Sequence, residues 1–186
     1  MTGGRRLLLH ICCAPDATVP WPELTAEGYE VSGFFYGSNI HPEGEWRRRR
    51  DAVLKLANAV GSPAEFSLYE PDEWRAGVVG MENCPEGGER CGLCFGLQLG
   101  AAARLAASGG YDALCTTLTI SPHKNPAIVN EAGRTESARL GVEWIDRVWR
   151  KNDGFRRSVA RSTELGLYRQ NYCGCEYSAR NIEGIS

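Results

Sequence analysis

Residues 7–16 read Leu7-Leu8-Leu9-His10-Ile11-Cys12-Cys13-Ala14-Pro15-Asp16, and this stretch indicates the type of fold. The five residues before the cysteines form a short apolar run, which indicates a buried strand. A helix is expected to follow the cysteines, with Pro20 or Pro22 near its first turn and Gly28 at its end. The segment therefore predicts a strand and a helix joined by a turn that carries two thiols.

The alternation of strand and helix continues along the chain. Further strands are expected over residues 30–36, 64–68, 111–116 and 142–145. Further helices are expected over residues 42–58, 72–79, 89–107, 127–140 and 155–165. No internal repeat or long linker divides the chain, so we expect one α/β domain over residues 1–186. Its sheet should be mainly parallel, with right-handed crossovers and flanking helices.

Side chains that suit chemistry follow three of these strands. They are Cys12, Cys13 and Asp16 after the first strand, Asn39 and His41 after the second, and residues 116–124 after the fourth. In open parallel sheets, ligands bind beyond the carboxyl ends of the strands. The placement alone therefore predicts a single site at that edge of the sheet.

The amino-acid composition is that of a soluble globular protein. The 186 residues have a net charge of −2, with 42% hydrophobic and 24% charged residues, as in ordinary soluble globular proteins. No apolar run suggests a membrane span or an export signal, so a cytoplasmic protein with no membrane partner is expected. Structural disulfides are disfavoured in that compartment. Local basic groups, at residues 47–50 and 147–161, are either solvated helix faces or phosphate contacts.

Six of the eight cysteines occur in close pairs, which are Cys12-Cys13, Cys91-Gly92-Leu93-Cys94 and Cys173-Gly174-Cys175. Paired thiols at chelating distance favour soft metals or reversible redox chemistry. Cys84 and Cys115 have no such partner. We expect Cys115 to be a small buried apolar residue at the end of a strand, and Cys84 to lie in a loop.

The spacing admits two kinds of metal site. Cys91 and Cys94 should share one face of a helix, and strand-end thiols could complete either an iron–sulfur cluster or a zinc site. Zinc sites commonly use two C-x₂₋₄-C pairs, and this chain has only one, which favours iron–sulfur. Either Cys13 joins the helical pair while Cys12 lies near Cys173, or Cys12 is itself a cluster ligand. The C-x-C pair suits metal ligation or a strained, readily reduced disulfide.

Five motifs occur in a fixed order along the chain. They are Leu9-His10-Ile11-Cys12-Cys13-Ala14-Pro15; Asn39-Ile40-His41-Pro42 with Glu45 and Arg49; Glu86 to Cys94; Thr116 to Asn125; and Tyr168 to Cys175 followed by Ser178. Together they closely resemble the cobalamin-independent epoxyqueuosine reductases, the QueH family. The resemblance runs from about Leu7 to Ser178, which is nearly the whole chain.

This resemblance implies a Rossmann-like fold related to the PP-loop (HUP) group. It also implies a [4Fe–4S] cluster and the last step of queuosine synthesis, the reduction of epoxyqueuosine in tRNA to queuosine. Carried over by position, the cluster ligands would be Cys12, Cys13, Cys91 and Cys94. Cys173 and Cys175 would be a redox-active or second-metal pair, on a segment that closes over the active site. Many relatives have cysteine where this chain has Asp16, which favours a second ion, iron or zinc, at Cys12, Asp16, Cys173 and Cys175.

The reaction needs proton donors, substrate contacts and a source of electrons. The proton-donor candidates are Tyr172, His123, Lys124 and Asp16, and the substrate-contact candidates are Asn39, His41, Arg134, Arg169 and residues 47–50. The partners would be tRNA with epoxyqueuosine in its anticodon loop and a separate electron donor. His10, inside an apolar strand, is expected to be a hydrogen-bonded core residue.

Two other functions compete with this one. A PP-loop-like tRNA sulfur-transfer enzyme would carry a glycine-rich pyrophosphate loop after the first strand, where this chain has Cys12-Cys13-Ala14-Pro15-Asp16. A zinc-stabilised tRNA-binding protein would be colourless and would carry neither iron nor sulfide. The leading prediction remains an iron–sulfur oxidoreductase that acts on tRNA.

Overall fold

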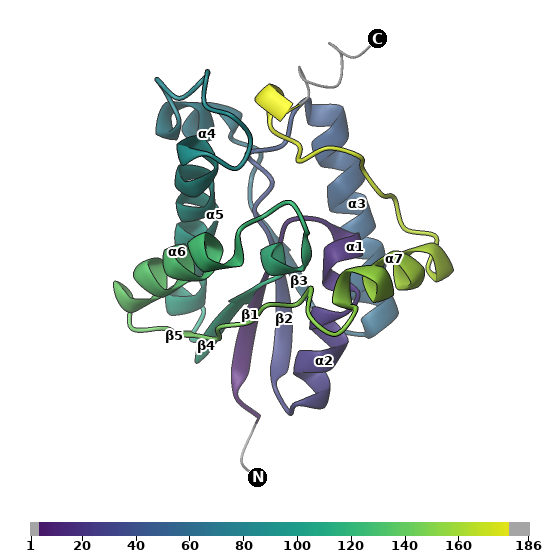
Figure 1. The fold of residues 1–186 in the computed structure, drawn as a ribbon. Helices are drawn as coiled ribbons and strands as arrows, with labels where there is room; N and C mark the ends of the chain where they lie inside the picture. Colours follow the sequence, from purple (N-terminus) through teal and green to yellow (C-terminus); the bar gives the residue numbers. More distant parts are fainter. Residues whose placement is uncertain (1–3, 179–186) are drawn as a thin grey trace.

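The computed structural model describes residues 4–178 and is built around a five-stranded sheet (Figure 1). The strand order is β3-β2-β1-β4-β5, and every neighbouring pair runs parallel. The strands are β1 (Arg6–Ile11), β2 (Glu30–Phe35), β3 (Ala64–Phe66), β4 (Ala113–Thr116) and β5 (Glu143–Trp144). The parallel α/β architecture expected from the sequence is therefore confirmed.

Helices cover both faces of this sheet. They are α1 (Ala14–Ala17), α2 (Pro20–Ala26), α3 (Glu43–Val60), α4 (Pro71–Gly77), α5 (Glu89–Ser108), α6 (Pro126–Ala138) and α7 (Gly154–Glu164), with a 3₁₀ turn, η1 (Leu118–Ile120). Six of the seven helices lie where the sequence predicts them, within a few residues. The short α1 and η1 were not predicted, because three or four residues are too few to show a helical period.

The central strand β1 contributes to both layers of the core. Leu7 and Leu9 pack in one apolar cluster with Trp21 of α2 and Leu56 of α3, whereas Leu8 packs in another with residues of α5. This follows from the alternation of side chains along a strand. Helices α4, α5 and α6 accordingly lie on one face, and α1, α2, α3 and α7 on the other (Figure 1). The run of residues 7–11 is apolar throughout because β1 is covered on both faces.

By length and composition alone, helix α5 could cross a membrane. Within the described residues, however, its apolar side chains Leu99, Ala102, Ala103 and Ala106 are fully buried. They pack in clusters with side chains of the sheet and of α6. A core helix of a globular protein meets the same hydropathy test, so α5 is not evidence for a membrane span.

The strand order reverses direction between β1 and β4. From β1 the chain crosses to β2 and β3 on one side, and later returns to β4 and β5 on the other. Such a reversal leaves a crevice at the carboxyl ends of the two central strands. Cys12 follows β1 at this edge, and Thr117 follows β4 beside it, with the Cys12 backbone N–H donating to the Thr117 Oγ1 at 3.4 Å.

Candidate redox site

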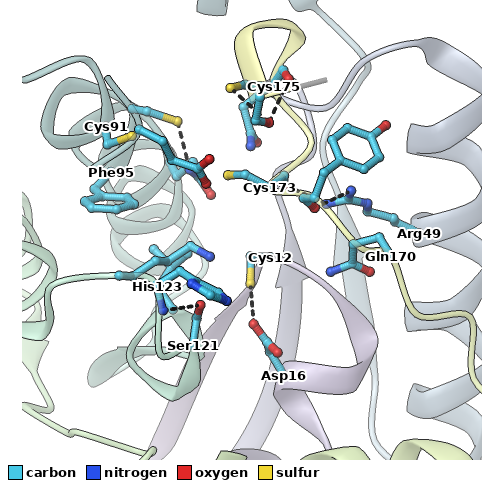
Figure 2. A pocket seen from close by; sticks show the side chains of 18 of the residues that line it. Cys12, Asp16, Arg49, Cys91, Phe95, Ser121, His123, Gln170, Cys173 and Cys175 are labelled. Carbon is cyan, nitrogen blue, oxygen red and sulfur yellow. Dashed lines mark hydrogen bonds between the residues drawn. The ribbon is translucent and has the colours of Figure 1, made fainter. Parts of the chain in front are cut away.

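A pocket of about 700 Å³ lies beyond the carboxyl ends of the strands. Five of the eight cysteines line it, and they are Cys12, Cys91, Cys94, Cys173 and Cys175. They come from the end of β1, the first two turns of α5 and the segment after α7. Figure 2 shows Cys12, Cys173 and Cys175 along the middle of the pocket, with Cys91 on the α5 side. Three distant pieces of the chain thus bring thiols to one place.

The segment after β1 presents a thiol and a carboxylate together. The Cys12 Sγ donates to the Asp16 Oδ2 at 3.4 Å. The ligand atoms of Cys12, Cys13 and Asp16 all lie within 4.8 Å of one another, as a metal site requires. Hydrogen bonding to Cys13, together with burial, raises the pKa of the Cys12 thiol well above its usual value. Cys13 is buried and does not line the pocket, whereas Cys12 does.

Both α5 thiols accept hydrogen bonds from N–H groups. The Gly87 backbone N–H donates to the Cys91 Sγ at 3.2 Å. The Trp74 Nε1 and the Gln98 Nε2 donate to the Cys94 Sγ at 3.2 and 3.1 Å. Burial raises the pKa of Cys94 to about 12, and these two bonds act against burial by stabilising the thiolate. Donors aimed at a buried sulfur suit a thiolate ligand of a metal or cluster.

Sequence reasoning missed both Trp74 and Gln98. For Gln98 a signal was present, because it lies four residues after Cys94 on a predicted helix and so shares its face. For Trp74 there was none, since the contact joins α4 to α5 across the fold.

The two thiols of the Cys173-Gly174-Cys175 segment have pKa values shifted in opposite directions. The hydrogen bond from Cys173 lowers the pKa of Cys175 to about 6 against the opposing effect of burial, and Ser178 contributes in the same direction. The same interaction, with burial, raises the pKa of Cys173 well above its usual value. A thiolate beside a thiol is the arrangement of a reactive or metal-binding pair.

Among the proton-donor candidates, Lys124 has the strongest electrostatic ties to the thiols. It is half-buried and lines the pocket. Burial disfavours its charge, but the negative charge of Cys173, Cys12 and Asp16 outweighs burial and raises the Lys124 pKa. Its ammonium therefore keeps its proton. Tyr172 also lines the pocket, but its hydroxyl donates to the His41 backbone oxygen at 2.8 Å.

The predicted substrate contacts divide into two groups. Asn39 and Arg169 line the pocket, as does His123 among the proton-donor candidates. His41 is buried outside the lining, with its Nδ1 3.3 Å from the Tyr69 hydroxyl. Arg134 lies on the exposed surface of α6, paired with Glu131 at 3.0 Å and with Asp146. Gln170 and Glu86, which belong to the sequence motifs but were given no role, also line the pocket.

Each arginine of residues 47–50 has an acidic partner close by in the sequence. Arg47 pairs with Glu43, Arg48 and Arg49 pair with Glu45, and Arg50 pairs with Asp51. Arg47, Arg48 and Arg50 are solvated helix residues outside the pocket, whereas Arg49 is buried and lines the pocket.

The two expected core assignments are confirmed. His10 is fully buried, with its Nδ1 2.9 Å from the Thr116 Oγ1, and burial lowers its pKa to about 3. Cys115 is buried in the apolar cluster beside β1. Cys84, half-buried in the loop before α5, does not line the pocket.

Comparison with known families agrees with this geometry. The sequence profile of the epoxyqueuosine reductase QueH family matches residues 7–181. The chain belongs to this family. Curated QueH members include proteins of Streptococcus pyogenes serotype M1, 37% identical over 96% of this chain and 72% of the relative, and of Thermotoga maritima, 35% identical over 92% and 89%. That of Acinetobacter baylyi is 37% identical over 95% and 81%.

Two solved structures with a similar fold are, by name, a tRNA-modifying enzyme and a predicted subunit of one. The U34-tRNA thiolase NcsA of Methanococcus maripaludis, solved with its [4Fe–4S] cluster, superposes with a TM-score of 0.60 at 14% identity. The match covers 99% of this chain and 66% of that one, slightly less than two thirds of its length. A predicted subunit of tRNA methyltransferase from Methanocaldococcus jannaschii gives a TM-score of 0.59 at 9% identity. These likenesses confirm the Rossmann-like fold that the QueH resemblance implies.

Proposed function

We propose that this protein reduces epoxyqueuosine in tRNA to queuosine, the last step of queuosine synthesis. The observation that carries the proposal is the meeting of five thiols, Asp16 and Lys124 in one pocket at the strand ends. Family membership supplies the substrate. The reaction takes up two electrons and two protons, breaks both carbon–oxygen bonds of the epoxide and releases the oxygen as water, leaving an alkene.

The donor set fits a [4Fe–4S] cluster. Cys91 and Cys94 would hold it from α5 and Cys12 from the end of β1, since all three line the pocket. Cys13, the fourth ligand that the family resemblance implies, is buried next to Cys12 and is not on the lining. The N–H groups directed at Cys91 and Cys94 support this assignment, since they favour thiolate over thiol. A bound cluster supplies electrons one at a time.

A second ion, iron or zinc, fits the remaining donors. Asp16, Cys173 and Cys175 line the same pocket as Cys12, and the lowered pKa of Cys175 suits a thiolate ligand. A carboxylate with two or three thiolates is a donor set that both metals accept. A bound ion supplies Lewis acidity toward the departing oxygen.

We assign the proton donor to Lys124. Its ammonium lies among acidic groups on the lining of the pocket, where it can hold a proton for the epoxide oxygen. Replacing Lys124 with glutamine should lower kcat by about 10²-fold or more, the usual contribution of a positioned acid. Iron and sulfide content should not change. Single-turnover assays would measure the loss, with Lys151→Gln, an exposed lysine, as the control. Unchanged turnover would remove Lys124 from this role.

The tRNA would deliver its modified base by unstacking it from the anticodon loop, as single-stranded bases are presented to enzymes. Asn39 and Arg169 line the pocket and are proposed to contact the base or its phosphates. Electrons must come from a separate reductant. Because the substrate is tRNA, we propose that the protein acts in the cytoplasm.

Replacing Arg169 with glutamine should weaken tRNA binding and make it less sensitive to salt. Arg169 is exposed at the pocket, and no acidic partner is recorded for it among the described residues. Loss of one phosphate contact should lower the slope of log Kd against log salt by about one. Titration of labelled tRNA at several salt concentrations measures this. Arg139→Gln, an exposed arginine paired with Glu136, is the control. Identical slopes for both variants would exclude the contact.

Nucleoside analysis tests the proposed function directly. Epoxyqueuosine-containing tRNA incubated with the chemically reduced, anaerobically purified protein should yield queuosine. A zinc-stabilised tRNA-binding protein would instead be colourless and would leave the nucleoside unchanged. Absence of iron and acid-labile sulfide after reconstitution would rule out the proposed enzyme.

A further inference from the structure

A buried ion pair lies beside the Cys173-Gly174-Cys175 segment. Arg49 of α3 is 2% exposed and Glu45 is fully buried, with the Arg49 Nε donating to the Glu45 Oε1 at 2.7 Å. The Tyr168 hydroxyl donates to the other Glu45 oxygen at 2.7 Å. Burial disfavours the carboxylate, but hydrogen bonds from Arg49, Tyr168 and Arg48 outweigh it and lower the Glu45 pKa. We call Arg49, Glu45 and Tyr168 the Arg49 brace.

The brace holds backbone, not side chains, of the cysteine segment. The Arg49 Nη1 donates to the Cys173 carbonyl at 2.8 Å, and the Nη2 to the Tyr172 carbonyl at 3.2 Å. The next carbonyl, that of Gly174, accepts from the His41 backbone N–H at 2.7 Å. Three consecutive carbonyls are therefore fixed from outside the segment. Figure 2 shows Arg49 reaching Cys173 from the side of α3.

The contact between Arg49 and the cysteine segment requires glycine at position 174. Its φ of +118° is a conformation that favours glycine, and a Cβ placed there would lie 2.8 Å from the Arg49 Nη1. The guanidinium also lies 5.1 Å from the Tyr172 ring centroid. The segment and the guanidinium are thus packed with no space for a side chain between them.

A buried ion pair is rarely retained for stability alone, because desolvating two charges offsets most of their attraction. Arg47 and Arg50 pair with exposed acids, and Arg48 reaches Glu45 from solvent with its own side chain exposed. Arg49 differs in that its remaining donors are directed at the backbone that carries Cys173 and Cys175. Fixing these carbonyls limits the directions in which the two sulfurs can point.

We propose that Arg49 is a positioning residue, which orients the Cys173 and Cys175 thiols toward the pocket by holding the carbonyls of residues 172 and 173. The inference rests on the proposed function, in which these thiols act during turnover. Arg49 also lines the pocket, but in this scheme it acts through the cysteine segment and contacts neither the reacting atoms nor a metal.

The test compares Arg49→Met with Lys55→Met. Lys55 is the matched control, since it also lies on α3 and donates to a backbone carbonyl of the same C-terminal segment, at Gly166. It is exposed, however, and does not line the pocket. In Arg49→Met, kcat should fall about 10²-fold with KM little changed, as expected for misplaced catalytic groups. Lys55→Met should keep its kcat, and Arg49→Lys should recover part of the loss.

A second readout does not depend on activity. Iodoacetamide labelling of the anaerobically purified full-length protein, mapped by mass spectrometry, compares Cys175, Cys84 and Cys115. Cys175 is buried, and in Arg49→Met it should become labelled as fast as half-buried Cys84, whereas Cys115 in the core stays protected. Unchanged protection of Cys175 would overturn the proposal. Loss of protection at Cys175 and Cys115 together would mean that Arg49→Met is unfolded, and the Gly174→Ala variant then decides between the outcomes.

The Gly174→Ala variant disturbs the same contact by changing the cysteine segment instead of the arginine. It keeps the Arg49–Glu45 pair but forces the segment away from the guanidinium, so it should expose Cys175 and lower kcat as Arg49→Met does. This variant decides the matter if Arg49→Met does not fold. Should the protein lack reductase activity altogether, the labelling pattern still tests the brace, and the two failures remain distinct.

Discussion

Replacing Cys91 or Cys94 with alanine should abolish the iron–sulfur centre and with it all reductase activity. These thiols supply two of the proposed cluster ligands from adjacent turns of α5, and both line the pocket. Loss of a thiolate ligand removes one of the few protein–iron bonds that hold the cluster in place. Iron and acid-labile sulfide should fall to background, and the broad visible absorbance of a cluster should disappear.

Cys84→Ala is the matched control for this prediction. Cys84 lies in the loop that precedes α5, within seven residues of Cys91 along the chain, but it does not line the pocket. Its variant should keep both cluster and activity. If Cys91→Ala and Cys94→Ala retained full iron and sulfide, the cluster assignment would be refuted.

Cys175→Ala should leave the cluster assembled but impair the reduction of the epoxide. The cluster thiols are untouched, so iron and sulfide at the cluster should remain, while turnover should fall by about 10³-fold. That figure corresponds to the several kcal/mol that a Lewis-acidic metal contributes to a reaction of this type. Metal analysis and single-turnover nucleoside assays on one preparation measure both quantities. Full activity in Cys175→Ala would show that the C-x-C pair has no part in the reaction.

Asp16→Asn distinguishes the two possible roles of that pair. If Cys173 and Cys175 bind a second ion with Asp16, then Asp16→Asn and Cys175→Ala should lose the same metal equivalent. If instead the thiols alternate between dithiol and disulfide, metal content should be equal in Asp16→Asn and the unmodified protein. The Cys12 Sγ lies 3.4 Å from the Asp16 carboxylate, which supports the metal role.

Local patterns predicted most of the secondary structure. The apolar run of residues 7–11 became the doubly covered strand β1, and the α5 and α7 boundaries fell within a few residues of expectation. Short elements such as α1, η1 and the two-residue β5 were missed or overextended, because their lengths are set by tertiary contacts. The positions of the thiols followed from the parallel sheet, since strand ends must gather at one edge.

The sequence alone identified the reactive groups. The reactivity of a thiol, a carboxylate or a lysine is a property of the residue type, and the spacing of these residues can be read before the fold is known. Only folding selected which of them share a pocket: Cys12 lines it and Cys13 does not, and Arg134 lies on another surface. The supporting contacts of Trp74 with Cys94 and of Arg49 with the Cys173 carbonyl were equally invisible beforehand. Each joins side chains and backbone that are distant along the chain, and such contacts depend on packing geometry, which no local pattern records.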